Sequence, residues 1–275
     1  MKTILPIAIC AVLLCAILCI AGIVIHTKNE NQREKQELSN SLYLEELENL
    51  KNERDEYEKE QKETQEKLKN YTVYQRFADG SFPIYVLYLG DATMYGAGVN
   101  PNTQSFRILL KQMYRDFTKN AIGTEISSRV NTEDVFKQAL SSVKAYVGTY
   151  PLHLTYLCVD SDEKYTDYAS NYEAIVRAAK EASDKADVVC IIHHNQSSED
   201  AESIKKIAAH YGTLLVDMRS AFEDAGASSL ESKDGIPNVE GNKLYADTIF
   251  AELKKAINES KAIKPTPSEP LFAQQ

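Results

Sequence analysis

Several carboxylates in this chain stand at the ends of short apolar runs, where acid–base or metal chemistry is common. Asp91 and Asp160 each follow such a run, and Asp234 precedes the last long helical pattern. Together with Asp162, these side chains could in principle gather around a divalent cation, because hard cations prefer carboxylate oxygens. Their spacing matches no metal-binding loop, and solvated surface acids explain it equally well. We therefore predict no metal and no cofactor.

The elements that must position these side chains are of two alternating kinds. Short apolar runs typical of buried strands occur at 83–89, 125–130, 153–159, 188–192 and 213–217. Amphipathic helical patterns separate them, and a last helix is expected at about 241–257. Parallel strands need such crossovers, so the pattern predicts an α/β fold, a three-layer α/β/α sandwich with a five-stranded parallel sheet. Sites in such sheets lie beyond the carboxyl ends of the strands.

Two sequence blocks at these ends carry a family resemblance. Residues 90–96 read GDATMYG after the first apolar run, and residues 234–241 read DGIPNVEG before the last helix. With the α/β pattern between them, the blocks resemble the SGNH (GDSL-type) hydrolases over about residues 83–257. The resemblance implies a flavodoxin-like hydrolase fold. It also implies a Ser nucleophile in the first block, and a catalytic His with its orienting Asp in the second.

The chain departs from the family's pattern at each catalytic position. Ala92 stands where the family has its Ser, and a methyl group cannot attack a carbonyl. The His of the second block is missing, and Pro237 and Asn238 close the gap, which leaves no neutral-pH base beside Asp234. Asp160 replaces the oxyanion-donating Asn, and its carboxylate would repel a developing oxyanion. Because a triad acts as a unit, the departures imply a pseudo-enzyme.

Two groups remain that could restore chemistry. Thr93 offers the hydroxyl nearest to Ala92, but it is expected to point elsewhere and has no assigned base. His193 and His194 follow the fourth strand, and adjacent strand residues point to opposite faces, so they are not expected to form a metal pair. Ordinary loop histidines are the favoured interpretation, and a substituted base is the alternative. Residues 127–131 also lack the Gly that the family uses as an oxyanion donor.

The chain before residue 80 has a different composition. Residues 4–25 carry no charge and would span roughly 33 Å as a helix, so we predict a single-pass membrane anchor in residues 1–27 rather than a cleaved signal. The flanking charges do not decide its orientation. Residues 28–75 are mostly charged, with a weak three-four spacing, and predict a helical stalk. A coiled coil that forms a homo-oligomer and a solvated single helix both fit this stalk.

Composition and these motifs together define the predicted function. The formal net charge of −9 excludes a strongly basic nucleic-acid binder. We predict a membrane-anchored pseudo-enzyme whose domain, residues 80–260, lies outside the cell and binds a cell-envelope glycan or a protein partner, followed by a disordered tail at 261–275. The alternatives are an esterase or acyl hydrolase acting on cell-surface carbohydrate through a rearranged site, and a scaffold acting through its stalk. The expected pocket contains Asp91, Ala92, Thr93, Asp160, Ser161, Asp234 and Asn238.

Overall fold

The chain forms two compact units, Met1–Glu66 and Lys67–Gln275. The structure is a computed structural model that describes residues 4–80, 84–118, 125–127, 135–147, 152–161, 166–232 and 234–272. Within these ranges, the side chains at 4–13, 15, 68 and 125–127 lie outside the description. Asp162 and most of the 127–131 block fall outside it as well.

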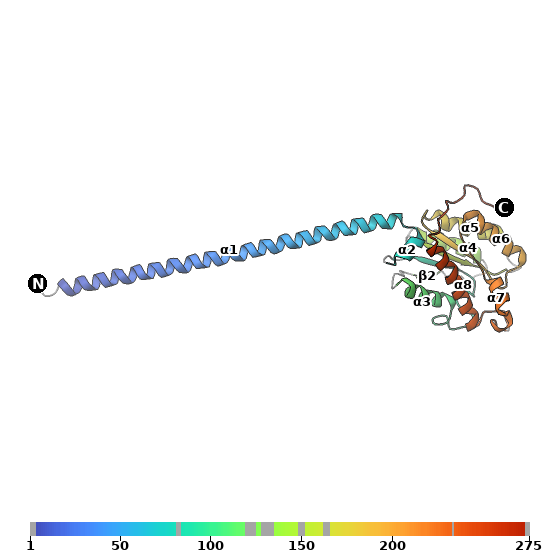
Figure 1. Ribbon diagram of the computed structural model, residues 1–275, viewed down its shortest axis with the longest axis horizontal. Helices are drawn as coiled ribbons and strands as arrows, with labels where there is room; N and C mark the ends of the chain where they lie inside the picture. The colour runs from blue at the N-terminus through green and yellow to red at the C-terminus, as the bar shows by residue number, and fades with distance from the viewer. Residues whose placement is uncertain are drawn as a thin grey trace. The chain divides into compact units, whose positions relative to one another are not determined.

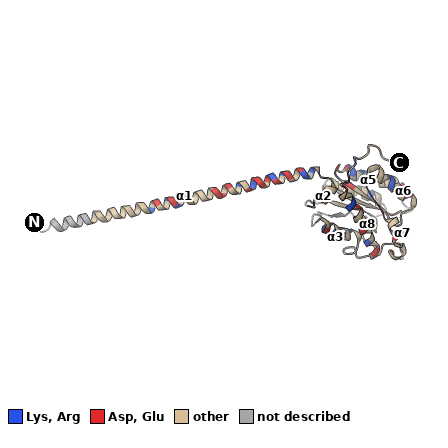
Figure 2. Ribbon diagram, in the orientation of Figure 1, with Lys and Arg blue, Asp and Glu red and all other residues tan. Residues whose placement is uncertain are grey.

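The N-terminal unit is one long helix, α1 (Ile4–Asn70), which continues into the start of the second unit (Figure 1). No Gly or Pro interrupts residues 23–70, which is consistent with one continuous helix there. Acidic and basic side chains alternate along its later part (Figure 2), with i,i+4 pairs such as Arg54–Glu58 at 3.6 Å. Most of the predicted stalk is thus helical, and its role as a spacer stays a prediction. Its exposed leucines, among them Leu38 with 61% of its surface exposed, leave self-association a prediction.

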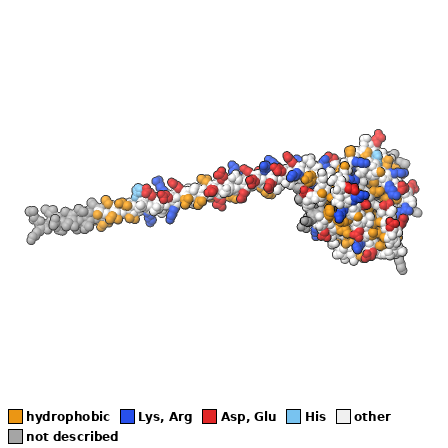
Figure 3. Space-filling model, in the orientation of Figure 1, with side chains coloured by type: hydrophobic (Ala, Val, Ile, Leu, Met, Phe, Trp, Pro, Cys, Tyr) orange, Lys and Arg blue, Asp and Glu red, His pale blue; other side chains and the backbone are white. Residues whose placement is uncertain are grey.

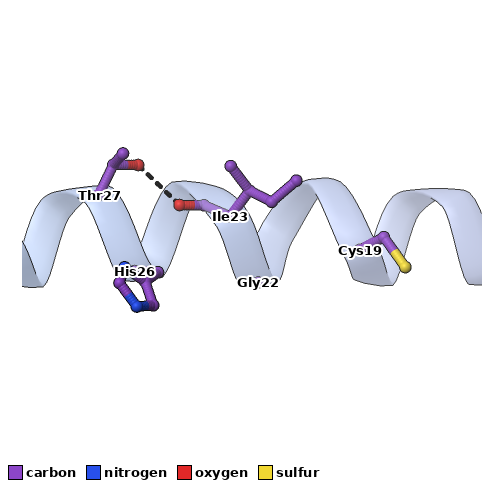
Figure 4. A pocket seen from close by; sticks show the side chains of 5 residues that line it. All are labelled: Cys19, Gly22, Ile23, His26 and Thr27. Carbon is purple, nitrogen blue, oxygen red and sulfur yellow. Dashed lines mark hydrogen bonds between the residues drawn. The ribbon is translucent and has the colours of Figure 1, made fainter.

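The apolar beginning of α1 was predicted to be a membrane anchor. In the part of the chain that the structure describes, no helix is long and apolar enough to cross a membrane. The anchor is therefore not confirmed, and the side chains at 4–13 lie outside the described residues. The described side chains that follow are largely hydrophobic (Figure 3). Figure 4 shows part of this stretch, in which Thr27 Oγ1 donates to the carbonyl oxygen of Ile23 (2.6 Å).

The globular unit is built on a parallel sheet. Among the described residues the sheet has five strands in the order β2-β1-β3-β4-β5. The strands are β1 (Val86–Gly90), β2 (Glu125–Ser127), β3 (Leu154–Cys158), β4 (Asp187–Ile192) and β5 (Leu214–Asp217). The register pairs Gly90 with Cys158 and Cys158 with Ile191, so the carboxyl ends of β1, β3 and β4 lie side by side. The predicted α/β fold with a parallel sheet is confirmed.

Helices cover both faces of this sheet. One face packs on α2 (Val73–Asp79), α3 (Phe106–Thr118), α7 (Met218–Ala225) and α8 (Val239–Asn258), and the other on α4 (Val135–Val147), α5 (Tyr168–Glu181) and α6 (Ser198–Tyr211). A short 3₁₀ turn, η1 (Ala227–Ser229), follows α7. Strand side chains alternate between two buried clusters, with Tyr88 and Tyr156 in the first and Leu87 and Leu157 in the second. The burial of all five residues of β1 and of β3 explains their continuous apolar runs.

The structure corrects two predicted boundaries. Helix α2 begins inside the predicted stalk, where Thr72 and Gln75 form a capping box, so the globular unit starts before residue 80. The tail predicted to be disordered instead contacts the domain over residues 261–272: Arg177 Nη2 donates to the carbonyl oxygen of Ser268 (3.1 Å) and Phe272 packs against the core. Composition does not report main-chain contacts of this kind, which is why disorder was expected.

Candidate active site

The loop after β1 is organised by the carboxylate of Asp91. Its Oδ1 accepts a hydrogen bond from the backbone N–H of Thr93 (2.8 Å), and its Oδ2 accepts one from the N–H of Asp160 (2.6 Å), in the loop after β3. Asp91 therefore closes its own turn and joins the two loops. Gly90 is required by their close approach, because a Cβ there would lie 2.0 Å from the carbonyl oxygen of Cys158.

Thr93 has a base partner that the sequence did not predict. Its Oγ1 lies 3.0 Å from Nε2 of His193, which follows β4. The sequence had assigned no base to Thr93, and the structure places His193 beside it. Thr93 is buried, with 7% of its surface exposed, whereas Ala92 beside it is exposed.

The same imidazole also contacts a carboxylate. His193 Nδ1 lies 3.2 Å from Oδ1 of Asp160, so hydroxyl, imidazole and carboxylate follow one another in a line of contacts. Burial lowers the pKa of His193, but the contact with Asp160 and the charges of Asp91, Asp160 and Glu231 outweigh it, and the net pKa is raised. The Asp160 side chain keeps 37% of its surface exposed, but the Oδ1 atom that faces His193 is buried and has no hydrogen-bond partner.

Two groups compete for Nδ1 of His193. The carboxylate of Asp160 needs a proton on that nitrogen, whereas the backbone N–H of Asn195, 3.2 Å away, needs its lone pair. The first arrangement leaves Nε2 free to accept the proton of Thr93, and the second does not. The hydrogen bond that the structure gives at Nδ1 is the one from Asn195, and Asp160 Oδ1 is buried without a hydrogen-bond partner, so His193 acts as a base only when its proton moves to Nδ1.

His194 lies beside His193 but is held as a neutral group. Burial and then the charge of His193 lower the pKa of His194 to about 4. Tyr245 Oη lies 2.8 Å from its Nδ1, and the carbonyl oxygen of Gly235 lies 3.0 Å from its Nε2. The two imidazole rings lie 4.1 Å apart, so the prediction that they point to opposite faces was wrong. Strand alternation ends with β4 at Ile192, and both residues belong to the turn beyond it.

The other predicted pocket residues do structural work or lie apart from this line. Asn238 caps α8 by accepting from the N–H groups of Glu240 and Gly241 (3.0 and 3.1 Å). Ser161 Oγ accepts from Gln196 Nε2 and donates to Asp200 of α6, so it is fully engaged. Asp234 is exposed, and it is not part of the line of contacts that Thr93, His193 and Asp160 form.

The described residues offer no metal centre at these loops, and two backbone amides there are already committed. Within those residues, no group of three or more His, Cys, Asp or Glu side chains could hold a metal ion. The backbone N–H groups of Thr93 and Asp160 already donate to Asp91. The site therefore brings a hydroxyl, an imidazole and a carboxylate together, whereas two nearby amide donors are committed to Asp91.

Comparison with known proteins supports this fold more strongly than it supports any reaction. No family model and no curated protein matches the sequence. Two crystal structures of a two-domain esterase (CEX) active on acetylated mannans match with TM-scores of 0.57 and 0.58 at 19% identity, over 73% and 72% of this chain. The chain spans 56% and 55% of those esterase chains.

A third crystal structure matches in the same way. The psychrotrophic esterase EstA from Pseudoalteromonas sp., inhibited by monoethylphosphonate, matches with a TM-score of 0.50 at 20% identity, over 63% of this chain and 98% of its own. At these identities the likeness concerns the fold alone. The globular unit of this chain has an SGNH hydrolase-like fold.

Proposed function

We propose that the globular unit is an acyl-ester hydrolase of rearranged design, in which Thr93, His193 and Asp160 take the parts of nucleophile, base and orienting acid. The observation that carries the proposal is the line of contacts from Thr93 Oγ1 to His193 Nε2 and from His193 Nδ1 to Asp160 Oδ1. Each residue follows a different strand of the sheet, β1, β4 and β3, at its carboxyl end. Such a constellation is recognised by geometry and role rather than by sequence position.

The chemistry follows from these distances. As Thr93 Oγ1 bonds to the acyl carbon of the ester, its proton passes to His193 Nε2, and Asp160 stabilises the imidazolium through Nδ1–H. The imidazolium then gives that proton to the departing alkoxide oxygen, which leaves as the alcohol. Water, deprotonated by the same Nε2, attacks the acyl-threonine, and the acid product leaves while Oγ1 recovers its proton. The protein returns to its starting state.

We expect this hydrolysis to be slow for two structural reasons. The N–H groups of Thr93 and Asp160 are bound to Asp91, and the loss of one oxyanion donor costs on the order of 10²–10³ in rate. Thr93 is also nearly buried, so an acyl group must reach its hydroxyl over the exposed methyl of Ala92. Small acyl groups such as acetyl fit that approach better than long chains. Because the two-domain esterase of similar fold is active on acetylated mannans, acetylated glycans are the natural substrates to try first.

The proposal is tested by following aryl acetate hydrolysis by the purified full chain. Thr93→Val removes the hydroxyl and keeps the side-chain shape, and we expect it to reduce turnover to the background rate. The matched control is Thr213→Val. Thr213 is also buried, but its hydroxyl contacts Cys190 and not the line of contacts that Thr93, His193 and Asp160 form. A fluorophosphonate probe should label the wild type at Thr93. Turnover that survives Thr93→Val would refute the assignment.

A second candidate function is non-catalytic binding in a vestigial site. The observation that favours it is the exposed Ala92 at the nucleophile's position, together with the committed amides beside it. In that case the full chain would show no turnover and no probe labelling, yet would bind acetylated glycan or a protein partner. Binding that Ala92→Trp abolishes, measured by calorimetry, would support this function.

A further inference from the structure

The tail beyond α8 is held on the domain by its main chain. Helix α8 ends at Asn258, and Ser260 adopts a left-handed conformation (φ 49°) that non-glycine residues rarely occupy. The chain then turns, and Lys261 Nζ donates to Asp187 (2.7 Å) and to the carbonyl oxygen of Gly212 (2.7 Å). Figure 1 shows the tail passing beside α5 to its end. The tail therefore starts from a strained hinge and ends on another part of the fold.

A buried carboxylate receives the end of this tail. Glu173 of α5 has only 2% of its surface exposed, and its two carboxylate oxygens accept the backbone N–H groups of Leu271 and Phe272, the latter at 2.6 Å. Tyr211 of α6 donates to the same carboxylate (2.8 Å). Without the tail, Glu173 would keep only the tyrosine among these partners, and a buried carboxylate left underbonded is costly.

Two cationic or polar side chains hold the preceding carbonyl groups. Arg177 of α5 reaches the carbonyl oxygen of Ser268 (3.1 Å), and His210 of α6 reaches that of Glu269 (3.2 Å). These four contacts all involve main-chain atoms of the tail, so they place few demands on its sequence. Pro265, Pro267 and Pro270 favour an extended path, since proline fixes φ and has no N–H to offer.

We propose that the surface formed by Glu173, Arg177, His210 and Tyr211 is a binding site for an extended peptide, filled in cis by residues 268–272, and that in trans it accepts the same tail from a second copy of this chain. The contacts on both sides are identical in cis and in trans, and the strained turn at Ser260 is the hinge that exchange requires. The site lies on α5 and α6 and is independent of the proposed hydrolase activity.

The first experiment measures binding of a fluorescent peptide with the sequence of residues 265–272. A chain truncated after Lys264, which keeps the Lys261 contacts, should bind it at least about tenfold more tightly than the full chain, whose own tail is a tethered competitor. Arg177→Ala in the truncated chain should weaken binding severalfold. The matched control is Arg219→Ala, because Arg219 also pairs with a Glu four residues on, at 3.3 Å, but does not contact the tail. Equal binding by the truncated and full chains would overturn the proposal.

The second experiment needs no truncation and guards against a truncated chain that fails to fold. Hydrogen–deuterium exchange of the full chain should show slow exchange at Leu271 and Phe272. An excess of the unlabelled peptide should displace the tail and speed exchange at these two amides severalfold, with α8 unaffected. Exchange that stays unchanged at saturating peptide would show that the tail is a fixed part of the fold and not a replaceable ligand.

Discussion

Two charged clusters lie at opposite ends of the parallel strands, one at the amino ends (the amino edge) and one at the carboxyl ends (the carboxyl edge). They differ in how many hydrogen bonds their carboxylates accept. At the amino edge, Asp187 is buried and accepts hydrogen bonds from Tyr74 (2.6 Å), Lys261 (2.7 Å) and the N–H of Val188 (2.8 Å), with Lys180 Nζ 3.7 Å away. At the carboxyl edge, Asp160 is partly exposed, and its carboxylate contacts Nδ1 of His193 (3.2 Å).

This difference separates a structural cluster from a chemically available one. The amino-edge carboxylate accepts three hydrogen bonds, so it cannot bind a new group without losing some of them. The carboxyl-edge cluster holds an imidazole with a raised pKa between a hydroxyl and an open acid. Availability for chemistry therefore depends on unfilled bonding capacity near solvent, not on the number of charged residues.

The largest effect is expected from Asp160→Asn, which tests whether the carboxyl-edge cluster is the chemically available one. An amide cannot hold the Nδ1–H tautomer of His193, so we expect kcat for an aryl acetate to fall on the order of 10³–10⁴-fold. Since Asp160 helps to raise the pKa of His193, the rise of kcat/KM with pH should also shift to lower pH in the variant. A fall in kcat with the pH profile unmoved would contradict the proposed contact.

The corresponding change at the amino edge should act on stability. Asp187→Ala leaves Lys180 buried without its acid, and we expect the free energy of unfolding to fall by about 3–5 kcal/mol. Asp160→Asn changes a partly exposed side chain, and it should lower the free energy of unfolding by no more than about 1 kcal/mol. Urea denaturation of both variants checks this. Equal losses would mean that the two clusters do not differ as described.

A smaller effect on stability is expected at acidic pH, where the buried neutral side chains of His153 and His194 are the relevant groups. Burial, as the main cause, lowers the pKa of His153 and of His194 to about 4 in the folded protein, against about 6.5 unfolded. The unfolded chain therefore binds more protons between these values, and stability should fall as pH drops from about 6.5 towards 4. His153→Gln should flatten this dependence in urea titrations, and a dependence as steep as that of the wild type would contradict the assignment.

The smallest effect is expected from Ala92→Ser. The serine would restore the family's residue, but Nε2 of His193 is already bonded to Thr93. We expect turnover of an aryl acetate to change less than about threefold. A gain of a hundredfold or more, measured in the same assay, would show that position 92 and not Thr93 faces the base.

The sequence was sufficient for the fold and for the edge of the sheet that carries the site. Apolar runs separated by amphipathic helices predicted the parallel strands, and the chemistry-bearing residues do follow β1, β3 and β4. The pairing of Thr93 with His193 was missed because strand alternation was extended into a turn, where it does not hold. A usable signal existed, since Thr93, Asp160 and His193 follow three strands that are neighbours in this sheet order.

The family resemblance suggested site residues that do not take part in the contacts between Thr93, His193 and Asp160. It drew attention to Asp234 and Asn238, which the family uses near its catalytic His, but here the first is exposed and the second caps α8. Sequence blocks report which loop shapes a fold retains more reliably than which side chains meet across them. Contacts between loops depend on turns whose backbone angles short-range patterns do not encode.

The two hydrogen bonds accepted by Asp91 have a mechanical consequence. Because one carboxylate grips the loop of Thr93 and the loop of Asp160, the two loops behave as a rigid coupled pair rather than as independent arms. A ligand that presses on either loop displaces the nucleophile and the orienting acid together, and the line of contacts through His193 can shift without being taken apart.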